Sequence, residues 1–131
     1  ESGAYNEAIE TYHKMLSIQS FREPYFNLGF IHHQYLKVFE VAIDYYTKAI
    51  EIEPTYIDAY YNRALCFEQQ QEFEKAEKYL DKALKITKRA NDLDTQAKIY
   101  EAFSELEENK KNYAKKSSLT MSIGMFITQK F

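Results

Sequence analysis

The chain has 131 residues, of which 45% are apolar and 28% charged, and this balance is typical of a single soluble globular domain. Its net charge is −3 and no basic stripe is present to neutralise phosphates, which argues against a nucleic-acid partner. Cys66 is the single cysteine, so an internal disulfide is excluded, and no apolar run approaches the roughly 20 residues that span a membrane. These features favour a cytoplasmic (intracellular) protein without a membrane partner.

Apolar residues recur at steps of three and four along nearly the whole chain, which predicts amphipathic helices. The predicted helices lie at about residues 5–18, 25–35, 42–52, 57–70, 76–86 and 92–109, with one more near the C-terminus. Pro24 and Pro54 mark the boundaries between units, because proline suits a first helical turn and breaks a helix interior. We therefore expect an all-α protein of about seven helices.

Several rows of residues return every 34 positions along the chain. The rows are Lys14, Lys48 and Lys82; Ile18, Ile52 and Ile86; Ala8, Ala42 and Ala76; and Tyr5, Phe39 and Phe73. A period of this size indicates one helical unit used repeatedly, in which each copy buries its apolar face against its neighbours. Arrays of this kind present a long concave surface to a partner.

The residues within each period follow a recognisable order. One copy reads Tyr25-x-x-Leu28-Gly29-x-x-His32, then Ala42-x-x-x-Tyr46 and Pro54, and the next reads Tyr60-x-x-Arg63-Ala64-x-x-Phe67, then Ala76-x-x-x-Leu80. This order resembles the tetratricopeptide repeat, a helix-turn-helix unit of about 34 residues. The resemblance implies a right-handed α-solenoid forming a single domain, 1–131. Its parts would be the second helix of a partial repeat at 1–21, repeats at 22–54 and 55–90, and a divergent repeat plus a C-terminal helix at 91–131.

Some positions explain, or depart from, the repeat pattern. Gly29 and Ala64 are expected where the two helices of a unit cross closely, since a larger side chain there would overpack. One extra residue is expected in the turn near Leu36–Val38, because Asn27 and Asn62 are 35 positions apart. Leu36 and Gln71 stand where the family usually has a turn glycine, which predicts looser or longer turns.

The sequence contains no pattern that indicates catalysis. A glycine-rich phosphate loop, a His-Glu-x-x-His motif and a nucleophile elbow are all missing from it. His32 and His33 point about 100° apart on a helix and cannot share a metal, and we expect His32 to be a core residue. Cys66 has no basic neighbour to activate it and is also expected in the core. The sequence therefore predicts no enzyme activity, no metal site and no cofactor.

The family resemblance implies that the first helix of each repeat lines the concave face. The candidate partner-binding residues are Phe26, Asn27, Phe30, His33, Tyr61, Asn62 and Leu65. Around them the resemblance places Glu23, Gln34, Asp58, Glu68 and Gln69 and, in the divergent repeat, Lys98, Glu101, Ala102, Glu105 and Glu108. The paired asparagines could hold the backbone of an extended peptide through both donor and acceptor. Alternatively, they could hydrogen-bond across adjacent helices and rigidify the stack, and the aromatics could be buried by neighbouring turns.

The resulting prediction is a protein–protein interaction module, an adaptor or scaffold that binds a peptide segment or partner helix. The resemblance also allows a test for the carboxylate clamp with which co-chaperone repeats hold acidic chaperone tails. Glu23 stands at a clamp lysine position, and Ala102 or Gln96 at the arginine position, so an acidic tail is a poor fit.

The alternative is a structural segment of a larger assembly, a homodimer or multiprotein complex, that docks through uncapped helical ends. These ends would expose apolar side chains at both termini. The expected residues are Ile9, Tyr12 and Leu16 at one end and Leu119, Ile123, Phe126, Ile127 and Phe131 at the other.

Overall fold

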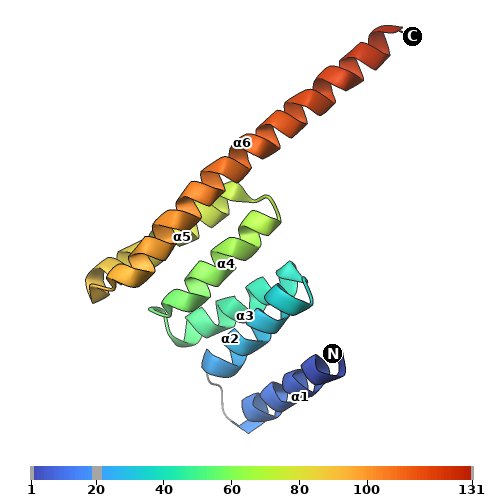
Figure 1. The fold of residues 1–131 in the computed structure, drawn as a ribbon. Helices are drawn as coiled ribbons and strands as arrows, with labels where there is room; N and C mark the ends of the chain where they lie inside the picture. The colour runs from blue at the N-terminus through green and yellow to red at the C-terminus, as the bar shows by residue number, and fades with distance from the viewer. Residues whose placement is uncertain (1, 19–21, 131) are drawn as a thin grey trace.

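The computed structural model describes residues 2–18 and 22–130, and side chains at 2–16 and 22–125. Within these residues the chain forms six α-helices, one of which continues into a π-helical segment. They are α1 (Ser2–Ile18), α2 (Arg22–Phe30), η1 (Ile31–Tyr35), α3 (Phe39–Ile52), α4 (Ile57–Gln69), α5 (Phe73–Ala90) and α6 (Leu93–Lys130). Two helical hairpins, α2–α3 and α4–α5, stack side by side between α1 and α6 (Figure 1). The predicted all-α solenoid is confirmed.

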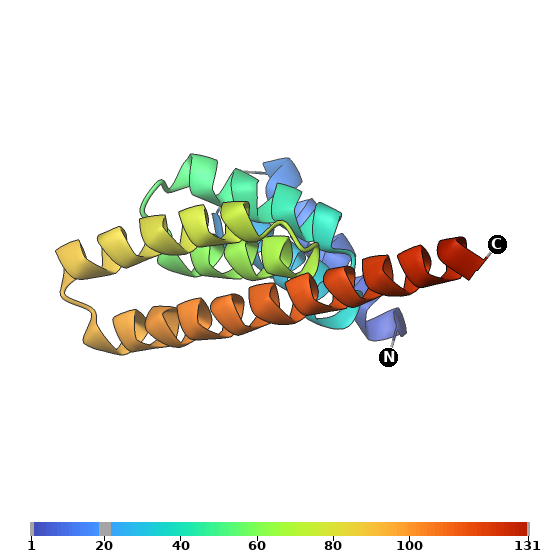
Figure 2. The ribbon, with the colours of Figure 1, turned by 90° about the horizontal axis from the view of Figure 1, so that it is seen from above.

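The C-terminal part of the chain differs from the prediction. The range 91–131 was expected to contain a divergent repeat and a further helix, but the structure has one continuous helix, α6, so the described helices number six and not seven. No glycine or proline lies between residues 93 and 123 to interrupt it. A turn was expected after residue 109, where the predicted helix ended. At this position Asn109 instead donates a 2.7 Å hydrogen bond to Glu68, which attaches the continuous helix to α4. Figure 2 shows the second half of α6 extending beyond the hairpins.

The core is a continuous cluster of buried side chains that runs through the two hairpins into α6. Alanines occupy the closest crossings, and six of them are fully buried: Ala42, Ala49, Ala59, Ala64, Ala76 and Ala83. The helices cross even more closely at Gly29, because a Cβ built there would lie 2.7 Å from two ring carbons of Tyr46. The predicted close crossing of the two helices at Gly29 is therefore confirmed.

The extra residue of the first full repeat lies inside the helix, not in the turn at Leu36–Val38 as predicted. η1 is π-helical, and the Leu36 amide donates to the Ile31 carbonyl, five residues back, at 3.0 Å. A π-turn accommodates one residue more than an α-turn without ending the helix.

This placement keeps His32 in register with the next repeat. Its ring centroid lies 5.4 Å from that of Tyr45, and Phe67 has the same 5.4 Å contact with Tyr79. The Nδ1 atom of His32 also lies 2.8 Å from the Leu28 carbonyl oxygen. His32 is thus a half-buried packing residue in the row of Phe67, as predicted.

Left-handed residues end the first helix of each hairpin. They are Lys37 (φ 57°) and Gln71 (φ 63°), so Lys37, and not Leu36 as predicted, occupies the position of the usual glycine. After Gln71 the Glu72 amide donates to the Phe67 carbonyl at 2.9 Å, which closes a Schellman-type turn. The turns are therefore tight, although side chains with a Cβ form them.

Replacing Gln71 by glycine is expected to stabilise the fold by about 1 kcal/mol, because glycine removes the steric cost of the left-handed conformation. Urea denaturation of the Gln71→Gly variant measures this gain. The matched control is Gln70→Gly, since Gln70 has φ −84° and gains nothing from glycine. Destabilisation by both variants would contradict the assignment of strain to Gln71.

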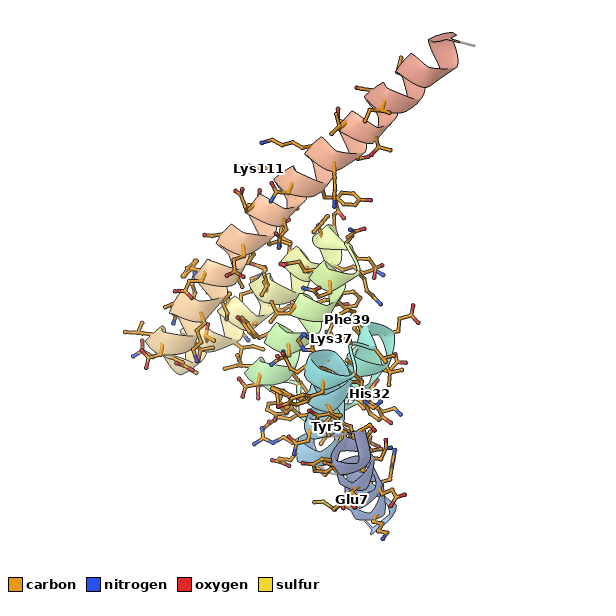
Figure 3. All side chains as sticks on the ribbon, turned by 45° about the vertical axis from the view of Figure 1, so that its right-hand side comes forward. Tyr5, Glu7, His32, Lys37, Phe39 and Lys111 are labelled. Atoms are coloured by element: carbon orange, nitrogen blue, oxygen red, sulfur yellow. The ribbon has the colours of Figure 1, made fainter. Side chains whose placement is uncertain are left out.

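The first helix packs on the first hairpin through aromatic contacts. Tyr5 (labelled in Figure 3) stacks on Tyr35 with ring centroids 4.7 Å apart, and His13 lies 6.4 Å from Tyr45. Ile9, Tyr12 and Leu16, predicted to form an uncovered apolar face, are each half-buried. At the other terminus Leu119 and Ile123 are exposed, whereas the side chains of Phe126, Ile127 and Phe131 lie outside the described residues. In the part of the chain that the structure describes, no helix is both long and apolar enough to cross a membrane.

Candidate functional site

Two adjoining clefts lie between α4 and α6, the first beside η1 and the second beside the turn that leads into α5. The first has a volume of about 330 Å³ and is lined by His33, Gln34, Lys37, Phe39, Leu65, Glu68, Gln69 and Glu105. The second, of about 660 Å³, is lined by Glu68, Gln69, Gln71, Phe73, Asn109, Asn112, Tyr113, Lys115, Lys116 and Leu119. Because Glu68 and Gln69 line both clefts, the two form one continuous hollow across the stacked repeats.

The floor of the first cleft is built around His33. Its side chain is buried, with Nδ1 3.2 Å from the hydroxyl oxygen of Tyr46 and its ring edge-on to Phe39. Burial, and then the positive charge of Lys37, lower the pKa of His33 to about 4, so the imidazole is neutral at neutral pH. Figure 3 labels Lys37 and Phe39, which lie at the turn that leads into α3. Among the predicted binding residues His33 thus lies at the floor, with little surface of its own.

The wall formed by α4 and α6 is acidic. Burial raises the pKa of Tyr61, and the carboxylates of Glu105, Glu101 and Glu68 raise it further, which places three negative charges around this phenol. Burial also raises the pKa of Glu68, against the hydrogen bond from Asn109, and the charge of Glu105 adds to the increase. A cation held there would relieve this repulsion.

The aromatic candidates on α2 are half-buried and contact other rings. The ring of Phe26 lies 5.5 Å from that of Tyr46 and 5.3 Å from that of Tyr56. Phe30 is 6.3 Å from Tyr35. On α4, Tyr61 and Leu65 are also half-buried and pack against the core. Each of these side chains therefore shares its surface between the core and the solvent.

Asn27 and Asn62 are both half-buried on the first helices of their repeats. Nδ2 of Asn62 donates a 2.8 Å hydrogen bond to the Asp58 carbonyl of its own helix. Within the described residues the two asparagines form no hydrogen bond with each other. The cross-helix bond considered from the sequence is thus not formed between this pair.

The structure brings some of the residues named by the resemblance into the first cleft and leaves others elsewhere. Gln34, Glu68, Gln69 and Glu105 were expected on the concave face and do line the first cleft. Lys37 and Phe39 were missed because they come from the turn and from the second helix. Phe39 did stand in a 34-residue row with Phe73, which also lines a cleft, so the row itself was an available signal. Ala102, assigned to the concave face, is buried in the core.

Cys66 lies in the core, as predicted. Its side chain is fully buried, and burial raises the pKa of its thiol to about 12, so the thiol stays protonated. Among the described residues, no group of three or more His, Cys, Asp or Glu side chains is arranged to hold a metal ion. The first cleft therefore offers a ligand apolar surface and the negative charge of Glu68 and Glu105 beside Lys37, whereas Lys115 and Lys116 line the second cleft.

Comparison with known proteins places this geometry in a family. Residues 23–56 and 57–86 each match a tetratricopeptide repeat. None of the curated proteins compared with the chain matches it. Neither family match is to an enzyme.

Solved structures share the arrangement of the helices. The TPR2B domain in the pHsp70 complex of yeast Sti1 aligns with 82% of this chain and 86% of its own, with 22% identity and a TM-score of 0.74. The first repeat domain of Spaghetti (RPAP3), bound to the HSP90 peptide SRMEEVD, covers 79% and 82%, with 25% identity and a TM-score of 0.61. MamA covers 85% and 67%, with 25% identity and a TM-score of 0.60. With its stacked helical hairpins and two matching repeats, the chain is a tetratricopeptide repeat domain.

Proposed function

We propose that this domain is an adaptor that binds an extended, lysine- or arginine-containing peptide segment in the first cleft, between η1, α4 and α6. The observation that carries the proposal is the combination of an apolar floor with an acidic wall. Phe39 and Leu65 line the same cleft as Glu68 and Glu105. An apolar side chain of the ligand would fill the floor while a neighbouring cation pairs with the carboxylates.

The asparagine row and the aromatic residues would complete this site. Asn27 and Asn62 recur on successive first helices, so their carboxamides can bind the peptide backbone at two points. Phe26, Phe30 and Tyr61 supply half-buried rings beside them. In this arrangement the asparagines fix the direction of the ligand and the carboxylates select its charge.

The charge of the proposed ligand separates this domain from the similar structures. The peptide bound by Spaghetti has the sequence SRMEEVD, which is predominantly acidic. In this chain Glu23 occupies the position that the family resemblance gives to a clamp lysine, and Glu101 and Glu105 flank Tyr61. An acidic peptide would therefore be repelled where a basic one is attracted.

A direct test measures the affinity of two fluorescent decapeptides that differ only in charge. One carries two lysines beside a phenylalanine, and the other has glutamates at the lysine positions. We expect the lysine peptide to bind, and Glu105→Lys to weaken its binding about tenfold, because a cation on the wall repels the ligand. Glu40→Lys, the same charge change at an exposed residue of α3 outside the cleft lining, is the matched control. Preference for the glutamate peptide would overturn the proposal.

The asparagine row can be tested with the same peptide. The Asn27→Ala/Asn62→Ala variant is expected to bind it more weakly while its thermal stability stays nearly unchanged, because the two side chains do not hydrogen-bond each other. Fluorescence anisotropy and thermal unfolding, measured on one preparation, separate the two effects. A collapse of stability would assign these residues to packing instead.

The proposal includes an intracellular location for this domain. The single, buried and protonated thiol Cys66 is compatible with a reducing compartment, and an intracellular protein would supply the peptide segment.

A further inference from the structure

Apart from the contact of Tyr113 with Phe73, the second half of α6 is not packed against another element in the described residues. Every side chain from residue 111 to residue 125 is exposed, including Leu119 at 62% and Ile123 at 51%. Figures 1 and 2 show this half of the helix extending away from the hairpins. Helices in proteins gain most of their stability from packing an apolar face against other elements, so this segment lacks its main source of stability.

The first half of α6 also has an uncovered face, which comparison of the repeats reveals. A tyrosine followed four residues later by a small residue occurs in each first helix: Tyr25 and Gly29, Tyr60 and Ala64, and Tyr100 and Ser104. Gly29 and Ala64 are buried by the second helix of their own hairpin, whereas Tyr100 is 49% exposed and Ser104 is exposed. On the first half of α6 the face with Tyr100 and Ser104 is therefore exposed, whereas the corresponding positions of the other repeats are covered.

The two halves of α6 carry opposite charge. Residues 93–108 contain five acidic side chains and one lysine, whereas residues 109–130 contain five lysines and no acidic side chain. Two such helices attract each other when they lie antiparallel, because each acidic half then faces a basic half.

We propose that two copies of this chain pair through α6, antiparallel, about a two-fold axis between Lys111 and Asn112. With this axis, each residue of one copy faces the residue of the second copy that lies equally far along the helix on the other side of the axis. Ser104 then faces Leu119 of the second copy, Tyr100 faces its Ile123 and Glu108 faces its Lys115. The small Ser104 thus receives Leu119, the ring of Tyr100 packs on Ile123, and each contact and ion pair is formed twice. Lys111, labelled in Figure 3, lies next to the axis.

Contacts in the middle of α6 favour a second copy over folding back within one chain. A fold-back needs a turn near residues 109–112, where Asn109 is bonded to Glu68 and Lys110 is 3.7 Å from Glu77. Immediately beyond, the ring of Tyr113 lies 5.5 Å from that of Phe73. The straight helix keeps all three contacts, and the second copy covers its exposed half.

Sedimentation equilibrium of the full chain tests this pairing by charge reversal. The wild type is expected to form dimers, and Glu108→Lys or Lys115→Glu alone to weaken dimerisation about tenfold, because both symmetry-related ion pairs become repulsive. The double variant Glu108→Lys/Lys115→Glu restores opposite charges and should dimerise like the wild type. Glu40→Lys on α3 is the control for net charge and should change nothing.

A mixing experiment makes the test independent of folding defects. The two single variants are each expected to dimerise poorly alone but to form a heterodimer when mixed, since one then supplies lysines at both positions and the other supplies glutamates. Native mass spectrometry identifies the heterodimer when one of the two variants is labelled with nitrogen-15, because the three dimers then differ clearly in mass. A wild-type chain that stays monomeric, or a dimer insensitive to both single reversals, would overturn the proposal.

Discussion

Substitution of Gly29 by alanine is expected to lower the free energy of unfolding by about 2 kcal/mol, although alanine is the better helix former by about 1 kcal/mol. The added Cβ would lie 2.7 Å from Cδ1 and Cε1 of Tyr46, whose ring is fully buried. That ring cannot move away easily, because Phe26 packs on it and His33 contacts its hydroxyl. Urea denaturation of the variant measures the loss.

The second repeat supplies the control for this prediction. There Ala64 stands where Gly29 does, and Leu80 stands where Tyr46 does. In the Tyr46→Leu background, Gly29→Ala should therefore be neutral or stabilising. An equal loss in both backgrounds would show that the cost of alanine does not come from the Tyr46 ring.

Stability should also depend on pH through His33. Burial and the charge of Lys37 hold the pKa of this imidazole at about 4, below its usual value of 6.5, so the unfolded chain binds a proton more readily than the folded one. The contribution of His33 is complete above pH 6.5 and is lost as the pH falls from 6.5 towards 4. We expect a loss of about 2 kcal/mol between neutral pH and about pH 4.5.

The His33→Gln variant isolates this effect from the titration of carboxylates. Glutamine keeps a polar group near the Tyr46 hydroxyl but does not titrate, so the variant should lose less stability than the wild type over the same pH range. The measured quantity is the difference between the two pH profiles, obtained by urea denaturation. Parallel profiles would mean that His33 is protonated in the folded state or accessible to solvent.

The sequence was sufficient for the repeat architecture because its signals are local and repeated. Alanines at fixed positions specify close helix crossings, and their complete burial follows from that geometry. The same reasoning placed Gly29 correctly against the second helix of its hairpin and His32 in the row of Phe67.

The sequence was insufficient where tertiary contacts decide between local alternatives. Whether an extra residue lies in a turn or in a π-helix depends on neighbouring contacts. Here the extra residue lies in η1, and Lys37, not Leu36, therefore takes the left-handed conformation of the turn. The continuity of α6 depends likewise on the contacts of Asn109 and Tyr113 with the second hairpin. The burial of His33 could not be predicted from the sequence. A histidine is buried there because its ring nitrogen finds a partner in the hydroxyl of Tyr46, and only the fold brings the two together.

The candidate site contains residues that the family resemblance named in advance, but only the fold shows that two of its carboxylates lie close together. Glu68 and Glu105 are 37 positions apart in the sequence, yet they line one cleft beside Leu65. Their proximity gives the first cleft its acidic wall, which is the reason for proposing a basic ligand.

The most direct test of the account is a map of amide chemical shifts in the chain on addition of the lysine decapeptide. We predict that the largest changes occur at Tyr61, Asn62, Leu65 and Glu68 on α4, with Glu105 on α6 and Lys37 after η1. Exposed residues of α3 away from the cleft, such as Asp44 and Glu51, and residues of α6 beyond Leu119 should change little. Changes confined to those two regions, with the cleft residues unaffected, would contradict peptide binding in the concave hollow.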